Sequence, residues 1–201
     1  MPNTLLTPAI EGQLRRLQTL VEKWTPRINL VAKSTVSDIW SRHILDSVVL
    51  CDGLLPKIGV WADLGAGGGF PGLVVAIILA EQQPGASVVL VESDLRKSTF
   101  LREAARQLGL NVDVRSERAE ALEPLNADVI SARALASLDV LCGLAARHLA
   151  PGGICFFPKG EKFADEVENA RRHWRFDLEA RENLAHKGAA LLVLRNLSRV
   201  S

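Results

Sequence analysis

The sequence predicts an α/β protein in which helices cover both faces of a mostly parallel β-sheet. From about residue 57 onward, short β-rich runs alternate with helical segments, as crossover connections in a parallel sheet require. A loop with five glycines, at residues 63–72, directly follows the first of these runs. The last two β-rich runs are joined by a segment too short for a crossover helix, so we expect them to pair antiparallel.

The bulk composition indicates a folded protein. The chain has 201 residues, of which 48% are hydrophobic, enough to bury a sizeable core. Its net charge of +1 argues against a protein that coats a polyanion, but it permits a local basic patch. Apolar runs such as residues 72–80 are far shorter than the ~20 residues that span a bilayer. The first residues show no signal-peptide pattern, and we expect a soluble, cytoplasmic protein.

The three cysteines are Cys51, Cys142 and Cys155, which are widely spaced and form no CxxC or Cys/His cluster. Neither a zinc site nor a disulfide framework is predicted from such a pattern. We expect each cysteine to be a small buried apolar residue, and we expect no bound metal.

Residues 1–56 are predicted to form a helical appendage to a sheet domain at residues 57–201. Apolar residues recur at three- and four-residue steps between residues 10 and 24, which is typical of an amphipathic helix. We expect Pro26 to end that helix, because proline disrupts helical hydrogen bonding.

A second helix is expected to begin at Thr35. Residues 35–38 have the form of a capping box in which Asp38 reaches back to the start of the helix. We expect residues 53–56 to close the helix. Its apolar side would consist of Ile39, Trp40, Ile44 and Val48.

The remaining segments are expected to follow one another as strands and helices. β-Rich runs predict strands at residues 58–64, 87–93, 111–116, 127–132, 152–160, 175–184 and 190–197. Helical segments follow the first, second, fourth and fifth of them, at residues 71–82, 95–109, 137–149 and 162–173. Five parallel strands followed by a hairpin are the layout of the Rossmann-like, seven-stranded sheet of class I S-adenosylmethionine-dependent methyltransferases. The six-stranded dinucleotide-binding sheet differs from this methyltransferase sheet only late in the chain, where it lacks the closing hairpin.

The glycine loop is the main candidate ligand site. Gly65, Gly67 and Gly69 would allow a tight turn and let backbone N–H groups approach a ligand at the carboxyl ends of the strands. The loop lacks the Lys–Ser/Thr pair of a P-loop, and Pro71 removes one N–H that could bind a pyrophosphate. A carboxylate at Asp63 suits a cationic ligand. We therefore favour S-adenosylmethionine over a nicotinamide dinucleotide as the ligand of this loop. The alternative is that the glycines only form a tight turn and bind no ligand.

Two further strand ends point to the same ligand. Glu92 ends the second predicted strand, where an acid can accept two hydrogen bonds from a ribose diol, although a lone glutamate there is often merely solvated. Ala119 and Glu120 follow the third predicted strand, where their backbone or carboxylate groups would meet the adenine edge.

These residues belong to motifs that together resemble a known family. The motifs are INLVA (28–32), RHILDS (42–47), DLGAGGGFPG (63–72), VESDLRKSTFL (91–101), RAE (118–120), ISARALASL (130–138) and PKG (158–160). Over residues 10–197 the sequence resembles the glucose-inhibited division protein B family, the RsmG-type methyltransferases of bacterial small-subunit ribosomal RNA. The combination of Phe-Pro-Gly in the loop with the upstream Arg-His-Ile-Leu-Asp-Ser is specific to few methyltransferases.

The resemblance implies a class I fold, S-adenosylmethionine as methyl donor, and transfer to N7 of one guanine in 16S rRNA. It places donor contacts on Gly65, Phe70, Ala119, Glu120 and Arg133. Glu92 stands where the family usually has an acidic residue for the ribose. The product would be 7-methylguanosine in 16S rRNA.

Guanine N7 carries an exposed lone pair at neutral pH, so its methylation needs alignment rather than a general base. The sequence accordingly shows no catalytic dyad. Arg133 is predicted to orient the donor or the guanine, unless it serves in a structural ion pair. Arg42 and His43 form a polar block with Asp46 and Ser47 that would shape the guanine entrance. The alternative is that this block braces the helix against the domain.

The RNA contacts are only weakly indicated. The candidate phosphate ligands, for each of which the alternative is a solvated side chain, are Arg15, Arg16, Lys23, Arg27, Lys33, Arg96, Lys97, Arg102, Lys159 and the basic cluster at 170–175. We expect a monomer that acts on 16S rRNA or the small ribosomal subunit. The alternatives are a small NAD-dependent oxidoreductase, for which no substrate domain is evident, and a non-enzymatic RNA-binding module with a degenerate donor loop.

Overall fold

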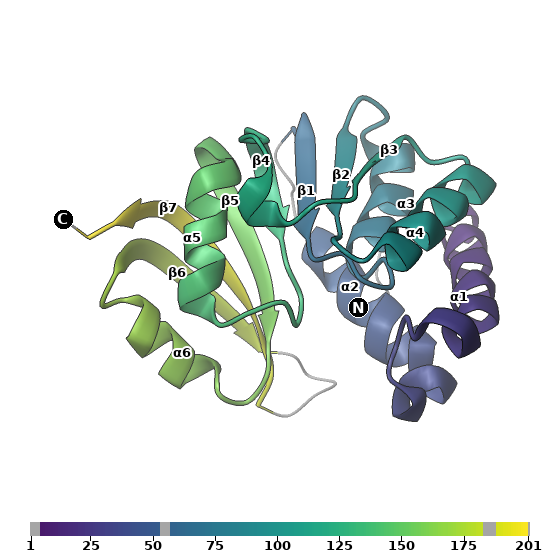
Figure 1. Cartoon of the computed structure of the whole chain (residues 1–201), viewed down its shortest axis with the longest axis horizontal. Helices are drawn as coiled ribbons and strands as arrows, with labels where there is room; N and C mark the ends of the chain where they lie inside the picture. Colours follow the sequence, from purple (N-terminus) through teal and green to yellow (C-terminus); the bar gives the residue numbers. More distant parts are fainter. Residues whose placement is uncertain (1–4, 53–56, 183–187, 201) are drawn as a thin grey trace.

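The computed structural model describes residues 5–52, 57–182 and 188–200, and it contains a seven-stranded sheet of order β3-β2-β1-β4-β5-β7-β6 (Figure 1). Neighbouring strands from β3 to β5 pair parallel, whereas β7 pairs antiparallel with both β5 and β6. The strands are β1 (Val60–Leu64), β2 (Ser87–Val91), β3 (Val112–Arg115), β4 (Ala127–Ser131), β5 (Leu149–Lys159), β6 (Trp174–Glu182) and β7 (Ala190–Arg199). The predicted sheet with its closing antiparallel pair is confirmed. The predicted connection at residues 185–188 lies, apart from Gly188, outside the described residues.

Helices cover both faces of this sheet. The helices after β1 are α3 (Gly72–Gln82), α4 (Leu95–Leu108), α5 (Leu138–His148) and α6 (Phe163–Ala170). Side chains alternate between the two faces along each strand. Trp61 of β1 thus packs in one apolar cluster with α3 and α4, while Ala62 and Leu64 pack in the other with α5.

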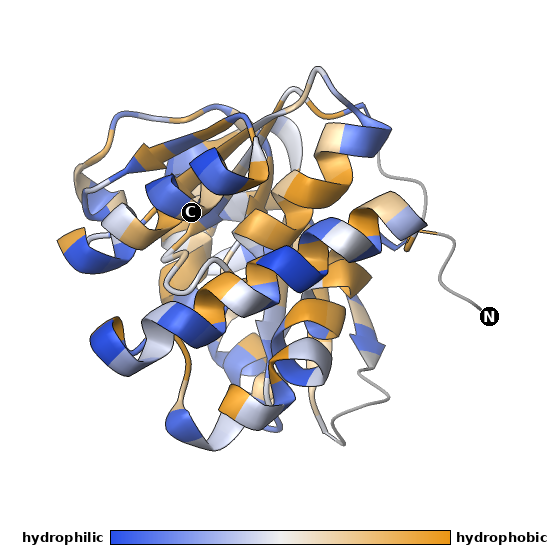
Figure 2. Ribbon diagram, turned by 90° about the vertical axis from the view of Figure 1, so that its right-hand side faces the viewer, coloured by the Kyte–Doolittle hydropathy of each residue, from blue (hydrophilic) through white to orange (hydrophobic). Residues whose placement is uncertain are grey.

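Helix α3 is apolar along its whole first eight residues, all of which are buried. A helix that is hydrophobic all round must be covered on every side. The sheet covers one side of α3, and the N-terminal helix α1 (Pro8–Ile28) packs against it as well. Figure 2 views the molecule from this side and shows hydrophilic residues of the outer helix in front of hydrophobic helices.

Helix α1 has the predicted apolar face, and Ile10, Leu14 and Val21 are buried. The expectation that Pro26 ends the helix is wrong, because α1 continues to Ile28. A proline removes one helical hydrogen bond, and so close to the end this loss is tolerated. The helix ends instead at Asn29, whose left-handed conformation (φ 54°) lets its N–H donate to the Thr25 carbonyl.

The expected regular helix from Thr35 is also wrong. The chain forms a series of short turns, namely η1 (Lys33–Asp38), the π-helical turn η2 (Trp40–Leu45), α2 (Asp46–Val48) and η3 (Val49–Cys51). No side chain caps η1. The Thr35 hydroxyl donates to the Ala32 carbonyl and meets the His43 ring instead of capping a helix. Ile39, Ile44 and Val48 are nevertheless fully buried, so three of the predicted apolar residues do face the core.

The N-terminal turns contribute to the same apolar cluster as α3, α4 and the strands. The predicted boundary at residue 56 lies outside the described residues, and the division into an appendage and a sheet domain stays a prediction. All three cysteines are buried and unpaired, which confirms their predicted role as packing residues. None of the described helices is both long enough and apolar enough to cross a membrane.

Candidate active site

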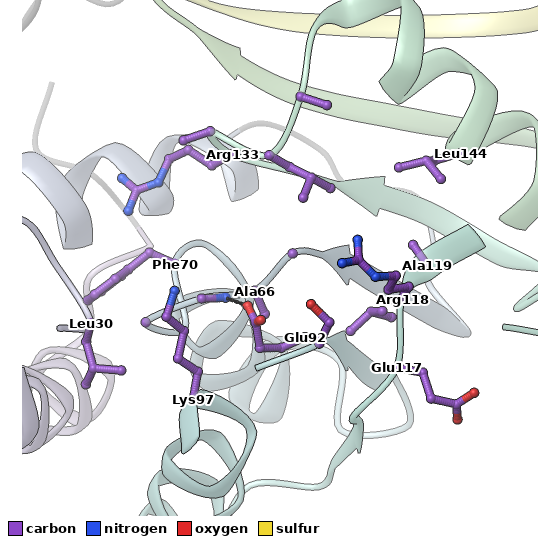
Figure 3. A pocket seen from close by; sticks show the side chains of 18 of the residues that line it. Leu30, Ala66, Phe70, Glu92, Lys97, Glu117, Arg118, Ala119, Arg133 and Leu144 are labelled. Atoms are coloured by element: carbon purple, nitrogen blue, oxygen red, sulfur yellow. Dashed lines mark hydrogen bonds between the residues drawn. The ribbon is translucent and has the colours of Figure 1, made fainter. Parts of the chain in front are cut away.

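A cavity of about 750 Å³ lies at the carboxyl ends of the central strands. Its walls come from the loops after β1, β2, β3 and β4, and from the N-terminal stretch 30–32 with His43. β1 lies between β2 and β4, so the cavity sits where the strand order reverses, the usual ligand position in such a sheet. The predicted donor residues that line it are Gly65, Gly67, Phe70, Glu92, Ala119, Glu120 and Arg133. Figure 3 labels Phe70, Glu92, Ala119 and Arg133 among them.

The glycines of the loop serve two different purposes. A Cβ on Gly72 would lie 2.3 Å from Leu90 Cδ2 and 2.7 Å from Asp63 Oδ2, so the start of α3 can approach the sheet only without a side chain. Gly67 instead lines the cavity in a left-handed conformation (φ +54°), and a Cβ there would meet only the Gly65 carbonyl oxygen, at 3.7 Å. Close packing against the sheet therefore explains the glycine at position 72. Gly67 keeps the cavity wall free of side chains.

Asp63 does not line the cavity, which corrects its prediction as a contact for a cationic ligand. Its side chain is fully buried, and its carboxylate accepts hydrogen bonds from the Gly72 N–H (2.9 Å) and the Ser131 hydroxyl (2.7 Å). The alternation of β1 places Asp63 on the same face as Trp61, toward α3 and away from the crevice. Burial raises the pKa of Asp63 to about 7, although both hydrogen bonds oppose the rise. Asp63 therefore ties α3 and β4 to β1.

Glu92 does line the cavity and is held rigidly there. One carboxylate oxygen accepts from the Gly67 N–H and the other from the Asp94 N–H, both at 2.8 Å. Each oxygen keeps a further lone pair for a ligand hydroxyl. The geometry thus fits a carboxylate that receives the two hydroxyls of a ribose, and its negative charge suits a cationic donor.

The turn at Ala119–Ala121 is positioned by a residue that the sequence analysis missed. His148, at the end of α5, is fully buried, and its Nε2 lies 2.8 Å from the Ala119 carbonyl oxygen. Because a carbonyl only accepts, Nε2 carries the proton and donates. Nδ1 has no hydrogen-bond partner among the described residues, and burial lowers the pKa of His148, so the ring is neutral. No motif in the sequence marks this histidine.

Arg133, His43 and Phe70 form a cluster at one end of the cavity. The Arg133 guanidinium donates from Nη2 to His43 Nδ1 (2.8 Å) and lies 5.5 Å from the Phe70 ring centroid. His43 Nε2 in turn lies 2.9 Å from the Thr35 hydroxyl oxygen. Since arginine cannot accept, Nδ1 is the acceptor and Nε2 carries the proton. Burial, then the charges of Arg133 and Arg42, lower the pKa of His43 to about 4, so the ring is neutral.

The predicted role of Arg42 in the site is not supported by its placement. The residue contributes its backbone carbonyl, which accepts from Arg133 Nη1 at 3.3 Å. Its side chain is exposed and does not line the cavity. In the irregular helical turn only His43 of this pair is directed to the cavity wall.

Several predicted phosphate contacts have partners within the protein. Arg15 lies over the Trp40 ring at 3.4 Å from its centroid, and Arg16 donates to the Gln107 carbonyl at 2.7 Å. Lys159 is not a freely solvated side chain. Its largely buried ammonium pairs with Glu166 (2.7 Å) and donates to the Ala136 carbonyl (2.7 Å).

Two basic residues of the cavity wall also differ from expectation. Lys97, predicted as a phosphate contact, points its amine into the cavity, and Arg118, which was not singled out, lines it as well (Figure 3). A signal for Lys97 was present, because it lies in the first turn of the helix after Glu92. The first turn of such a helix lies near the carboxyl end of the preceding strand.

The GidB family, described as rRNA small subunit methyltransferase G, matches residues 10–195. The protein belongs to the GidB family. Ribosomal RNA small subunit methyltransferase G of Cereibacter sphaeroides (strain ATCC 17029) is 50% identical over 188 residues, which cover 94% of this chain and 91% of that protein. The protein of the same name from Ruegeria sp. (strain TM1040) is 48% identical over 181 residues, covering 90% and 88%.

Solved structures place this GidB protein among the class I methyltransferases. M. jannaschii TYW2 in complex with AdoMet matches with a TM-score of 0.58 and 16% identity, covering 82% of this chain and 80% of that chain. The SAM-dependent O-methyltransferase TM0748 from Thermotoga maritima matches with a TM-score of 0.59 and 12% identity, covering 83% and 71%. At this identity the likeness concerns the fold. Family and fold together make the chain an S-adenosylmethionine-dependent methyltransferase, which rules out the NAD-dependent and non-enzymatic alternatives.

Proposed function

We propose that this GidB protein methylates N7 of one guanine in the 16S rRNA of the small ribosomal subunit and acts as a monomer. The names of its relatives support the RNA substrate. The observation that carries the proposal is the cavity itself, in which the glycine loop and the Glu92 carboxylate, hydrogen-bonded to Gly67, fit a cationic nucleoside donor.

S-adenosylmethionine, when bound, supplies a methyl group on a positively charged sulfur. In the proposed arrangement Glu92 binds the ribose hydroxyls, while Ala119 and Glu120 lie at the adenine edge. The Gly65–Gly69 loop leaves space for the remainder of the donor. Holding donor and acceptor in line is the main contribution that a protein makes to such a transfer.

The protonation state of His43 is consistent with an N7 acceptor. N7 of guanine loses no proton when it is methylated, so no general base is needed. His43 would be a poor base, because both ring nitrogens have partners and its pKa is lowered to about 4. We propose that His43 is a positioning residue, which holds the Arg133 guanidinium at the edge of the cavity.

Basic residues around the N-terminal wall are the proposed RNA contacts. Leu30, Val31 and Ala32 form part of the cavity wall, and Arg27 and Lys33 flank this stretch with exposed side chains. Phosphate groups next to a base that enters the cavity would pass close to them. Such contacts make binding steeply dependent on salt concentration.

The proposed function is tested with small ribosomal subunits from cells that lack this protein. Incubation with the purified protein and radiolabelled S-adenosylmethionine is followed by chemical cleavage of the 16S rRNA at 7-methylguanosine. We expect one cleaved position that depends on the protein. Label at another atom or in another RNA would refute the N7 assignment. Absence of any heat on titration with S-adenosylhomocysteine would refute the donor site.

A further inference from the structure

A second cavity, of about 1060 Å³, lies beside the first, and residues 133–136 form a wall common to both. Its other walls come from the N-terminal turns between residues 41 and 52, from the end of β5 and from the start of β7. Because β7 runs antiparallel to β5, its start lies at the carboxyl end of β5. Both cavities therefore lie at the same edge of the sheet, and only one loop separates their contents.

The common wall is a thin and unusual loop. Ala134 has a left-handed conformation (φ 54°), which a residue other than glycine rarely adopts. The side chain of Leu135 is 41% exposed and lines both cavities. From the side of the second cavity, Lys159 holds the loop through the Ala136 carbonyl (2.7 Å). Strained backbone that is held in this way is frequent at ligand sites.

The second cavity combines an apolar lining with charged side chains, of which Lys159 and Glu166 pair with each other. Apolar side chains suited to the face of a planar base come from Leu45, Val49, Leu50, Pro158 and Leu191. Asp46 and Arg133 add a carboxylate and a guanidinium to the same wall. They lie close enough for the charge of Asp46 to raise the pKa of Arg133 against the effect of burial. Arg133 keeps further N–H donors beyond those bound to His43 and the Arg42 carbonyl.

On the basis of the proposed function, we propose that the second cavity binds the target guanine, with Arg133 donating to O6 and the Asp46 carboxylate accepting from N1–H and the N2 amine. Guanine presents this acceptor and these donors side by side on its Watson–Crick edge. Adenine presents the opposite order at the same two positions, a donor and then an acceptor, so the pair would reject it. A base that is read on this edge must be unpaired and out of its stack.

This orientation also directs the reacting atom. N7 adjoins O6 on the side away from N1, so an arginine at O6 places N7 next to the wall shared with the donor cavity. N7 then uses its lone pair to bond the methyl carbon, the carbon–sulfur bond breaks, and its electron pair passes to sulfur. The positive charge moves from sulfur to the guanine ring, no proton leaves, and the carboxylate of Asp46 favours that charge.

Two exposed valines allow the cavities to be tested separately. Val49 lines only the second cavity and Val140 only the donor cavity, and they are 42% and 47% exposed. The three native cysteines are fully buried, and burial raises the pKa of the Cys51 thiol to about 12, so maleimides should spare them. The variants Val49→Cys and Val140→Cys are labelled with N-ethylmaleimide after folding, which separates blocking of a cavity from misfolding.

We expect S-adenosylhomocysteine to slow labelling of the V140C thiol about tenfold and to leave that of V49C unchanged. Small ribosomal subunits that lack the methyl group should slow labelling of V49C. Labelled V49C should keep its Kd for S-adenosylhomocysteine within about twofold, while methylation falls at least about 50-fold. The proposal is overturned if S-adenosylhomocysteine protects both thiols alike, or if labelled V49C methylates as fast as the unlabelled protein.

The reading of guanine by Asp46 is tested with Asp46→Asn, and Asp38→Asn serves as the matched control because its exposed carboxylate lines neither cavity. We expect D46N to lower kcat/KM for the subunit by about 30- to 100-fold with an unchanged donor Kd, and D38N to behave like the wild type. Wild-type kcat/KM in D46N would overturn this role. Failure of the proposed function would show separately, as no 7-methylguanosine formed by the unmodified protein.

Discussion

Glu92 supports the fold and, in the proposed function, also binds the donor, so replacing it should weaken both. Its two carboxylate oxygens accept from the N–H groups of Gly67 and Asp94 at 2.8 Å each, and the residue is only 8% exposed. A hydrogen bond to a charged group contributes about 1.5–3 kcal/mol, and a buried donor left without a partner loses its solvation. Glu92→Ala removes both bonds, so we expect a loss of about 3–4 kcal/mol in the free energy of unfolding.

Glu92→Gln keeps one acceptor oxygen and places an amide N–H₂ against the other backbone N–H. We therefore expect a loss of about 2 kcal/mol for this variant. For a chain of this length 1 kcal/mol corresponds to about 2–4 °C in Tm, so Tm should fall by about 4–8 °C for Gln and by about 6–16 °C for Ala. Both variants also remove the carboxylate that we propose binds the ribose, so the Kd for S-adenosylhomocysteine should rise at least about tenfold.

Thermal unfolding and isothermal titration with S-adenosylhomocysteine measure the two effects. Glu117→Gln is the matched control, because this exposed glutamate lines the same cavity without any hydrogen bond to the described part of the chain. Its Tm should stay within about 2 °C of the wild type. A Glu92→Ala protein with unchanged Tm and unchanged donor affinity would refute the reasoning. A changed Tm with unchanged affinity would refute the ribose contact alone.

Three further outcomes follow from the buried groups around the site. Asp63 has a folded-state pKa raised to about 7, so its contribution to stability is full below the ordinary carboxyl pKa near 4 and is lost as the pH rises toward 7. In urea unfolding, the free energy of unfolding of Asp63→Asn should therefore rise relative to that of the wild type by up to about 4 kcal/mol between pH 4 and 7. If the two proteins show parallel dependence of this free energy on pH, the raised pKa of Asp63 is contradicted. His148→Leu leaves the Ala119 carbonyl without its donor and should cost about 1–3 kcal/mol in urea unfolding, whereas an unchanged midpoint would show that the bond contributes nothing. His43→Ala should lower kcat for methylation about tenfold and Arg42→Ala should not, because Arg42 contributes only its carbonyl. Equal kcat values in these two variants would refute positioning by His43.

The fold and the position of the donor cavity were predictable from local patterns. Alternating β-rich and helical segments determine a parallel sheet, and the loop after the first strand of such a sheet lies at the ligand edge. For this reason Gly67 and Glu92 were found at the cavity wall as expected. Both lie within three residues of the end of a strand, where position in the chain already implies position in space.

Errors arose where side-chain direction or competing contacts decide the outcome. Asp63 lies one residue before the end of β1, and the alternation of the strand turns it under α3. Thr35 has the sequence form of a helix cap, yet its hydroxyl meets His43, which in turn accepts from Arg133, a residue 90 positions away. Arg15 and Arg16 are exposed, as expected of surface charges, but packing of α1 also gives them partners within the protein.

The order of the elements, the glycine loop and the acid after the second strand follow from the chain alone, since hydrophobic periodicity and turn residues act over short distances. The second cavity, the buried His148 beneath the Ala119 turn and the link from Arg133 to His43 exist only in the folded molecule. Each depends on side chains from segments far apart in the sequence. No local sequence pattern predicts which of these segments come into contact, because their contacts form only when the sheet and its helices pack together.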